Sequence, residues 1–593
     1  MKSKSKYMLR STVSLIAKRG FQTCFVSKNV HSVATREEMY SNLLRGYAQD
    51  SNLLCGRAIH AKLIIGSIPL TLFVQNHLLN MYVKIGDLHS GLKVFEEMPQ
   101  RNVVSWSAVM AGCVQNGCAS EALWLFSRMQ QEGVTKPNEF TFVSALQACS
   151  LTETENVTLA YQIYSLVVRS GHMSNIFLLN AFLTALVRNG RLAEAFQVFQ
   201  TSPGKDIVSW NTMIGGYLQF SCGQIPEFWC CMNREGMKPD NFTFATTLTG
   251  LAALSHLQMG TQVHAHLVKS GYGDDLCVGN SLADMYIKNH RLDEAFRAFD
   301  EMTNKDVCSW SQMAAGCLHC GEPRKALAVI AQMKKMGVKP NKFTLATALN
   351  ACASLASLEE GKQFHGLRIK LEGDIDIDVC VDNALLDMYA KCGCMDSAWG
   401  LFRSMNCCRS VISWTTMIMA CAQNGQSREA LQIFDEMRET SVVPNHITYV
   451  CVLYACSQGG FVDEGWKYFS SMTKDCGIFP GEDHYACMVN ILGRAGLIKE
   501  AKELILRMPF QPGALVWQTL LSACQLHGDV ETGKLAAERA IRRDQKDPST
   551  YLLLSNMFAE FSNWDGVVIL RELMETRDVQ KLPGSSWIEI EKI

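Results

Sequence analysis

Cysteine and histidine side chains are the first candidates for chemistry in this sequence, and they gather most closely at Cys317, His319 and Cys320. A Cys-x-x-Cys spacing can supply two of the four ligands that a tetrahedral zinc site needs. No second ligand pair accompanies it, and the sister segments carry plain turn residues at the same place. We therefore predict that these side chains do not hold a metal ion.

Other patterns that could carry chemistry also fail to indicate a metal or catalytic site. The acidic run Asp374, Asp376 and Asp378 is more typical of a solvated loop between helices than of a cation site. The sequence supports no glycine-rich phosphate loop and no Ser/His/Asp constellation. It predicts no cofactor, no metal and no enzymatic activity.

The composition is that of a folded chain. Of its 593 residues, 48% are hydrophobic and 19% are charged, and the formal net charge is −1. Disorder needs low hydrophobicity and high charge, so these values exclude it. No apolar run approaches the ~20 residues of a membrane-spanning helix, so we expect no membrane segment. The 24 cysteines have no pairing pattern, which favours reduced, buried thiols over a secreted disulfide framework.

Residues 1–36 differ from the rest of the chain. They hold eight basic residues and no acidic one, with Glu37 the first acid, and serines and threonines fill the gaps. A basic, hydroxyl-rich and acid-free amphipathic segment is typical of an organellar transit peptide, although an ordinary basic tail has a similar composition. Without these eight charges the remainder has a formal charge of about −9.

A super-repeat of about 103 residues organises the chain from Glu37 onward. The segments VVSWSAVMAGCVQNG, IVSWNTMIGGYLQF, VCSWSQMAAGCLHCG and VISWTTMIMACAQNG begin at 103, 207, 307 and 411, and two other segment families interleave with them. Their tryptophans lie 104, 100 and 104 residues apart. Each super-repeat therefore holds three units of roughly 35, 35 and 31 residues.

Each unit is predicted to form two helices. In the unit from Val103 the first helix ends near Asn116-Gly117, because glycine accepts a left-handed cap. The second helix carries an apolar stripe from Ala122 to Met129. One such hairpin cannot bury its stripe, but stacked neighbours can. We expect an all-α fold, a right-handed α-solenoid superhelix of helix-turn-helix repeats, in which the tryptophans serve packing.

These units resemble the pentatricopeptide repeats of plant organellar RNA-binding proteins, in the subclass that alternates normal, long and short units. The segments NALLDMYAKCG, TLATALNACASL and SWNTMI carry the likeness. The resemblance implies a transit peptide at 1–36, a repeat array of about 14 units at 37–513, two C-terminal E motifs at 514–582 and the start of a truncated extension at 583–593, without the DYW deaminase domain.

In this family two side chains of a repeat read one RNA base: the fifth residue of the first helix and the last residue of the repeat. A carboxylate only accepts hydrogen bonds, so a last Asp selects uracil or guanine, whereas Asn or Ser can donate to cytosine or adenine. The resemblance implies pyrimidines for Asn at the fifth place and purines for Ser or Thr. Carried over, the pairs are Asn76 with Asn102, Ser107 with Asn138, Asn180 with Asp206, Asn211 with Asp240, Asn280 with Asp306, Ser311 with Asn341, Asn383 with Ser410, and Thr415 with Asn445.

The implied target is pyrimidine-A-n-U-U-n-U-A-n-C-A-n-n. The long units and the last short unit offer mostly apolar fifth residues, so we expect them to read weakly; these residues are Ser41, Val143, Ala245, Ala346, Val450 and Ala486. Apolar residues take the second place, where the family clamps each base, as at Phe73, Val104, Phe177 and Val208. The same polar residues could also be plain helix caps and turn formers, but eight pairs in one register favour base reading.

A deaminase of its own is not predicted. A zinc-dependent cytidine deaminase needs His-x-Glu with Cys-x-x-Cys, and none of the 14 histidines is followed two residues later by Glu. His527 with Asp529 is the nearest approach. The resemblance therefore implies a site-recognition factor for C-to-U editing that recruits a DYW-type deaminase in trans, together with organellar editing accessory proteins.

The expected partner is single-stranded organellar RNA, and the expected location is the mitochondrion, with the chloroplast as the alternative. Two other functions stay open. A splicing or stability factor would use the same surface without editing, and a tetratricopeptide-like scaffold would show uniform spacing near 34 and no recurring polar pair.

Overall fold

The computed structural model describes residues 33–65, 71–152, 157–172, 174–371, 379–405, 409–577 and 579. The chain divides into two compact units, Met1–Asn289 and His290–Ile593, and each is described by itself. Within the described ranges every regular element is a helix, and none has the length and hydropathy to cross a bilayer. Most of the predicted targeting segment, the Asp374–Asp378 run and the predicted extension at 583–593 lie outside these residues.

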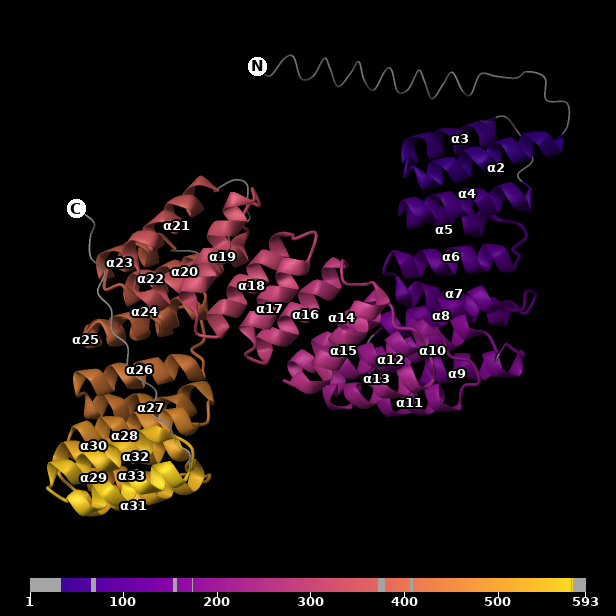
Figure 1. Ribbon diagram of the computed structural model, residues 1–593. Coiled ribbons are helices and arrows are strands. Elements are labelled where there is room, and N and C mark those ends of the chain that lie inside the picture. Colours follow the sequence, from indigo (N-terminus) through magenta and orange to yellow (C-terminus); the bar gives the residue numbers. More distant parts are fainter. Residues whose placement is uncertain are drawn as a thin grey trace, which may run out of the picture. The chain divides into compact units, whose positions relative to one another are not determined.

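The first unit is built from consecutive helices that pair as hairpins (Figure 1). They are α2 (Val33–Gln49), α3 (Leu53–Ile65), α4 (Leu72–Ile85), α5 (Leu88–Glu97), α6 (Val103–Gln115), α7 (Ala119–Glu132), α8 (Glu139–Leu151), α9 (Val157–Arg169), α10 (Ile176–Arg188), α11 (Leu192–Thr201), α12 (Ile207–Phe220), the 3-10 turn η2 (Cys222–Gln224), α13 (Ile225–Arg234), α14 (Asn241–Ala253), α15 (Leu257–Ser270) and α16 (Leu276–Lys288).

The second unit continues the same pattern. Its helices are α17 (Leu292–Glu301), α18 (Val307–His319), α19 (Pro323–Lys335), α20 (Lys342–Leu355), α21 (Leu358–Lys370), α22 (Val379–Lys391), α23 (Met395–Ser404), α24 (Val411–Gln423), α25 (Ser427–Glu439), α26 (His446–Gly459), α27 (Val462–Cys476), α28 (Glu482–Arg494), α29 (Ile498–Leu506), α30 (Ala514–His527), α31 (Val530–Arg543), α32 (Pro548–Glu560) and α33 (Trp564–Thr576).

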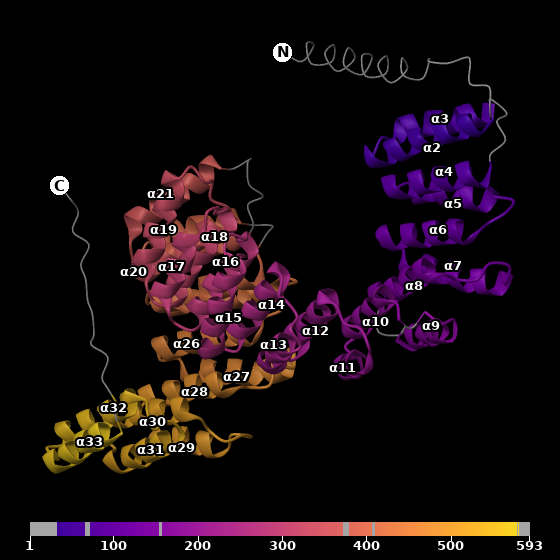
Figure 2. The ribbon, with the colours of Figure 1, turned by 45° about the vertical axis from the view of Figure 1, so that its right-hand side comes forward.

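The first helices of successive hairpins, which carry even numbers, form a continuous layer within each unit. Each contacts the next first helix, from α4 through α16 in one unit and from α18 through α32 in the other. Figure 2 shows α28, α30 and α32 side by side, with α29 and α31 in a second row. The predicted all-α solenoid of helical hairpins is thereby confirmed.

Apolar packing holds the layers together as the sequence predicts. The four repeated tryptophans are at most 3% exposed, and each meets the edge of a phenylalanine on the preceding second helix, with ring centroids 4.8 to 5.2 Å apart. The stripe from Ala122 to Met129 is buried. Helix α6 ends at Gln115, and Gly117 adopts a φ of 77°, so the predicted helix stop is confirmed.

The prediction of buried thiols is only partly right. Cys113 and Cys421 are buried, and burial raises the pKa of each thiol to about 12. Cys277, Cys308 and Cys380 are exposed instead. All three occupy the second position of a first helix, a place that points away from the packed interior.

Close approach of first helices makes Gly112 intolerant of a side chain. A Cβ on Gly112 of α6 would lie 2.1 Å from Cγ1 and 2.8 Å from Cγ2 of Val83 on α4. We expect Gly112→Ala to lower the free energy of unfolding by about 1–3 kcal/mol through overpacking. Gly215→Ala, in α12 with open space around the new Cβ, should raise it by about 0.5–1 kcal/mol. Urea unfolding followed by circular dichroism measures both, and equal effects would contradict the packing.

Candidate functional site

All eight residues predicted as the last of their repeats are the N-caps of the next first helix. Asp206 is representative, with an extended backbone (φ −111°, ψ 179°) and a carboxylate that accepts the N–H of Ser209 at 2.9 Å. A cap is needed because the first N–H groups of a helix have no partner within it. The others are Asn102, Asn138, Asp240, Asp306, Asn341, Ser410 and Asn445.

Direct hydrogen bonds join three of the eight predicted pairs. The distances from Nδ2 of the fifth residue to Oδ1 of the last residue are 3.0 Å for Asn180 and Asp206, 3.1 Å for Asn211 and Asp240, and 3.3 Å for Asn76 and Asn102. The fifth residues lie between consecutive first helices, where Asn180 and Asn211 are only 8% and 9% exposed. The half-buried last residue is therefore the more accessible member in the pairs of Asn180 with Asp206 and Asn211 with Asp240.

A third side chain completes each of these pairs: the hydroxyl at the third position of the next first helix. Its oxygen donates to Oδ1 of the fifth asparagine at 2.6–2.7 Å, from Ser209 to Asn180, from Thr243 to Asn211 and from Ser105 to Asn76. These three hydroxyl residues are fully buried. The capping box that they form with the last residue closes the network.

The network fixes which way the asparagine amide points. With Nδ2 of Asn180 toward the carboxylate of Asp206 and Oδ1 toward the hydroxyl of Ser209, both contacts of the amide join a donor to an acceptor. The reversed amide would set two acceptor oxygens against each other. Buried polar groups favour the fully satisfied arrangement, so the amide orientation is set by its neighbours.

In two further pairs the fifth residue carries a hydroxyl. There the threonine at the third position of the next first helix links the fifth residue to the cap. Oγ of Ser311 lies 2.6 Å from Oγ1 of Thr344, and Oγ1 of Thr415 lies 2.9 Å from Oγ1 of Thr448. Each threonine in turn donates to Oδ1 of the capping residue, from Thr344 to Asn341 at 2.9 Å and from Thr448 to Asn445 at 3.0 Å. A chain of hydroxyls thus links the fifth and last residues.

Two further predicted pairs, Ser107 with Asn138 and Asn383 with Ser410, show no such link among the described residues. Ser107 donates to the backbone oxygen of Val104 at 3.1 Å. Oδ1 of Asn383 is buried without a hydrogen-bond partner among the described residues, although Ser410 caps α24.

The pair of Asn280 and Asp306 spans the two compact units, so each residue is described alone. Asn280 is half-buried on α16. Asp306 is exposed and caps α18 through the N–H of Ser309 at 2.9 Å.

In Asp206 capping uses one carboxylate oxygen and leaves the other outside the network, whereas both oxygens of Asp240 accept from Nδ2 of Asn211, at 3.1 and 3.2 Å. Oδ1 of Asp206 accepts from the backbone N–H of Ser209 and from Nδ2 of Asn180, while Oδ2 accepts from no described residue. In Asn102 the same Oδ1 position takes the N–H of Ser105, so its Nδ2 occupies the outer place. The outer atom is an acceptor in the first case and a donor in the second.

Both carboxylates of the directly joined pairs are held in the ionised form. Burial would raise the pKa of Asp206, but hydrogen bonds from the backbone and hydroxyl of Ser209 and from Asn180 outweigh it, so the pKa lies below the usual 3.8. Asp240 behaves alike, because Thr243 and Asn211 outweigh the effect of burial. The outer oxygen is therefore an acceptor throughout the neutral range.

An exposed apolar side chain stands at the second position of most first helices. The four predicted residues are strongly exposed: Phe73 by 54%, Val104 by 51%, Phe177 by 71% and Val208 by 50%. The long units add Phe140, Phe242, Phe343 and Ile447, each at least half exposed. Large apolar groups exposed in a regular row mark a binding surface more often than chance exposure does.

No group of three or more metal-binding side chains occurs among the described residues. Cys317 is buried in α18, and burial raises the pKa of its thiol to about 11. The long-unit residues Val143, Ala245 and Ala346 occupy fifth positions without polar atoms, as predicted.

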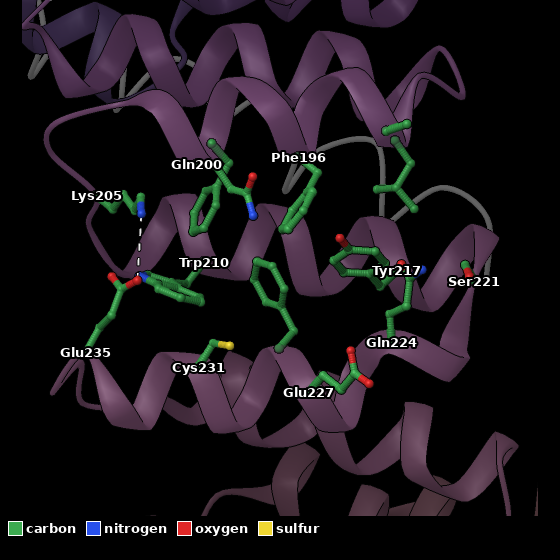
Figure 3. A pocket seen from close by; sticks show the side chains of 14 residues that line it. Phe196, Gln200, Lys205, Trp210, Tyr217, Ser221, Gln224, Glu227, Cys231 and Glu235 are labelled. Atoms are coloured by element: carbon green, nitrogen blue, oxygen red, sulfur yellow. Dashed lines mark ion pairs between the residues drawn. The ribbon is translucent and has the colours of Figure 1, made fainter.

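One cavity lies away from these positions, among α11, α12 and α13. Figure 3 shows the aromatic rings of Phe196, Trp210 and Tyr217 along it, with an ion pair of 3.7 Å between Lys205 and Glu235 at one end. The second helix α13, which lines this cavity, is short: it has 10 residues, whereas α7 has 14.

Comparison with known proteins places the repeats in a family. The matching stretches are 101–150, 305–354 and 409–458 for the family described as PPR repeat family, 76–103, 177–204, 280–307, 383–409, 447–476 and 483–510 for PPR repeat, and 527–589 for E motif. A putative pentatricopeptide repeat-containing protein of Arabidopsis thaliana is 36% identical over 542 residues, which is 91% of this chain and 78% of that protein. The chain belongs to the pentatricopeptide repeat family.

Other members differ in length and described location. Another Arabidopsis thaliana pentatricopeptide repeat-containing protein is 36% identical over 590 residues, and this chain spans 58% of its length. Two further relatives, 34% and 30% identical, are described as chloroplastic and mitochondrial. The pentatricopeptide repeat protein PPR10, solved in complex with an 18-nt psaJ RNA element, shares the fold with a TM-score of 0.54 at 18% identity, over 91% of this chain and 85% of that one.

The third-position hydroxyls were missed by reasoning from the sequence, although a signal was present. A serine or threonine stands three places after each of the eight predicted last residues, from Asn102 to Asn445. In α28 the place is taken by His484, whose Nδ1 accepts the N–H of Gly481 at 3.1 Å and whose Nε2 lies 2.9 Å from the backbone oxygen of His446. Burial lowers the pKa of this histidine, so it fills the place as a neutral ring.

Removing one such hydroxyl should destabilise the repeat measurably. Ser209→Ala leaves the buried Oδ1 of Asn180 without its donor, so we expect the free energy of unfolding to fall by about 1–3 kcal/mol. Ser209→Thr keeps the hydroxyl and should stay close to the parent. Thr212→Ala is the matched control, because that exposed hydroxyl on α12 bonds only its own helix; its effect should stay within about 0.5 kcal/mol. A loss as large for Thr212→Ala would contradict the assignment.

The lowered carboxylate pKa values give a defined pH dependence. Their contribution to stability is full above the unfolded pKa of about 3.9 and is lost as the pH falls through the lower folded pKa. The difference in free energy of unfolding between the parent and the double variant Asp206→Asn with Asp240→Asn should therefore be constant from pH 8 to about 5. It should shrink only below about pH 4. Denaturant unfolding at stepped pH measures it, and a decline near pH 6 would be inconsistent with this sign.

Proposed function

We propose that this chain binds single-stranded RNA with one base per hairpin and is the site-recognition factor for C-to-U editing of an organellar transcript. The carrying observation is an arrangement that recurs at the N-terminal end of several first helices. There a cap residue such as Asp206 or Asn102 keeps one hydrogen-bonding atom outside its network, beside an exposed apolar side chain at the second position. A base needs both an edge partner and a surface to stack on.

The pair of Asn180 and Asp206 has the polarity that uracil requires. One proton of Nδ2 is used on the carboxylate, which leaves the second proton as a donor and Oδ2 of Asp206 as an acceptor. Uracil presents an N3–H donor beside carbonyl acceptors, so both groups find partners. Cytosine has an unprotonated N3 in that place and would face the carboxylate with a second acceptor.

Replacing the capping Asp by Asn reverses that polarity without disturbing the helix. The N–H of the third residue must have an acceptor, so the amide oxygen turns inward, as at Asn102. The amide nitrogen then faces the RNA and donates to the ring nitrogen of cytosine or adenine. This supports adenine opposite Ser311 with Asn341 and opposite Thr415 with Asn445, where the resemblance also implies a purine.

Recruitment of a deaminase in trans is assigned to the C-terminal segment from Ala514 onward. The E motif match at 527–589 supports this, and Trp564 and Val568 of α33 are 63% and 55% exposed. Relatives described as mitochondrial and as chloroplastic support an organellar location, of which we favour the mitochondrion. Editing accessory proteins complete the proposed assembly.

A single exchange tests the reading mechanism. Asp206→Asn should change the preferred fourth base of the 13-nucleotide target from uracil to cytosine, with about tenfold weaker binding to the original RNA. Fluorescence anisotropy with RNAs that differ only at that base measures the change. The compensating RNA, with cytosine at the fourth position, should restore affinity for the variant. An unaltered base preference would refute this register, and equal binding of a scrambled RNA by the parent would refute RNA recognition.

A further inference from the structure

The C-terminal hairpins contain a side-chain arrangement that matches the reading pairs of the repeat array. Gln518 is the fifth residue of α30, Asp547 is the N-cap of α32, and Thr550 is the third residue of α32. The separations of 29 and 32 residues from Gln518 equal those from Asn211 to Asp240 and Thr243. The chain thus repeats the register of the array beyond its last short unit.

Hydrogen bonds join these three side chains. Oδ1 of Asp547 accepts the N–H of Ser549 at 3.0 Å and so caps α32. Nε2 of Gln518 donates to Oδ2 of Asp547 and to Oγ1 of Thr550, the latter at 2.8 Å. Thr550 is fully buried, whereas Gln518 and Asp547 are half-buried. The location is that of the pairs in the array, and Gln518 is more exposed than the buried Asn180 and Asn211.

The longer side chain of glutamine changes what is presented to a ligand. Both protons of Nε2 are used inside the network, one on Asp547 and one on Thr550, whereas Asn180 uses one. The amide cannot reverse without setting Oε1 against the carboxylate. The atoms left for a ligand are therefore Oε1 of Gln518 and the remaining lone pairs of Asp547, which are all acceptors.

We propose that Gln518 and Asp547 form a further base-reading position with a preference for guanine, an inference that rests on the proposed RNA-binding function. Guanine is the base whose pairing edge carries two adjacent donors, N1–H and the exocyclic amino group. Uracil carries one donor flanked by carbonyl oxygens, and adenine and cytosine place an unprotonated ring nitrogen there. Two acceptors side by side match guanine best.

A stacking surface accompanies the pair. Leu515 at the second position of α30 is 49% exposed, close to the 51% of Val104 and the 50% of Val208 at the same position in the array. These hairpins thus combine the polar pair, the buried hydroxyl and the exposed apolar group that support base reading elsewhere.

The register makes the position testable. Counting one base per hairpin from Asn76 places Ala486 at the thirteenth nucleotide and Gln518 at the fourteenth. Binding of the full chain is measured by fluorescence anisotropy to four RNAs that carry the predicted 13 bases followed by A, C, G or U, and to a scrambled RNA. We expect the RNA with guanine to bind about tenfold more tightly than the other three.

Two substitutions and a matched control locate the effect. Asp547→Asn keeps the cap but replaces an acceptor, and Gln518→Leu keeps the size but removes the amide. Both should abolish the preference at the fourteenth base and leave discrimination at the fourth base intact. Asp529→Asn is the control, because Asp529 caps the second helix α31 through Thr532 and should change neither. Circular dichroism melting checks that each variant is folded.

The outcomes separate the two proposals. If the parent prefers the predicted bases over the scrambled RNA but is indifferent at the fourteenth base, this site is refuted and the array reading stands. If the parent binds predicted and scrambled RNAs equally, the proposed function fails and this site fails with it. A guanine preference that survives both substitutions also overturns the assignment.

Discussion

The need to cap every first helix is the constraint on which this molecule depends. The first N–H groups of a helix have no acceptor within the helix, and here the N-termini of consecutive first helices recur at one place in each hairpin. The predicted cap residues therefore sit at the junctions of hairpins, and three of them contact the fifth residue of the preceding first helix. A side chain with two polar atoms satisfies the helix with one, as Asp206 does with Oδ1, and leaves the other for a ligand.

Capping and recognition are therefore compatible roles of the same side chain. The buried third-position hydroxyls of Ser209 and Thr243 hold the neighbouring asparagine amides in one orientation, so within these two pairs an exchange of the cap changes the polarity at the cap and leaves that of the asparagine unchanged. Asp and Asn cap equally well, and exchanging them alters the outer atom while the helix, its packing and its register stay unchanged. Recognition can vary from hairpin to hairpin in this way without a change of fold.

Local sequence patterns predicted the fold, because a helical hairpin depends on helix stops and apolar stripes that all lie within one repeat of about 35 residues. The burial of Trp106 and the stop at Gly117 follow from such patterns. The near-complete burial of Asn180 and the bridge from Ser209 could not be predicted so directly, because they depend on how closely one first helix approaches the next. The exposure of Cys308 was missed for the same reason: its helix position, and not its apolar character, decides where it points.

Two tasks are proposed for the C-terminal hairpins, base reading and recruitment of a partner protein, and they use different residues. Gln518 and Asp547 lie at the N-terminal ends of first helices, whereas Trp564 and Val568 lie on the second helix α33. A ligand at the first set contacts the layer of first helices, and a protein at the second set contacts the other row. Under the proposed function, the same pair of hairpins would hold the RNA on the layer of first helices and a recruited partner on the other row, so the two would not compete for one surface.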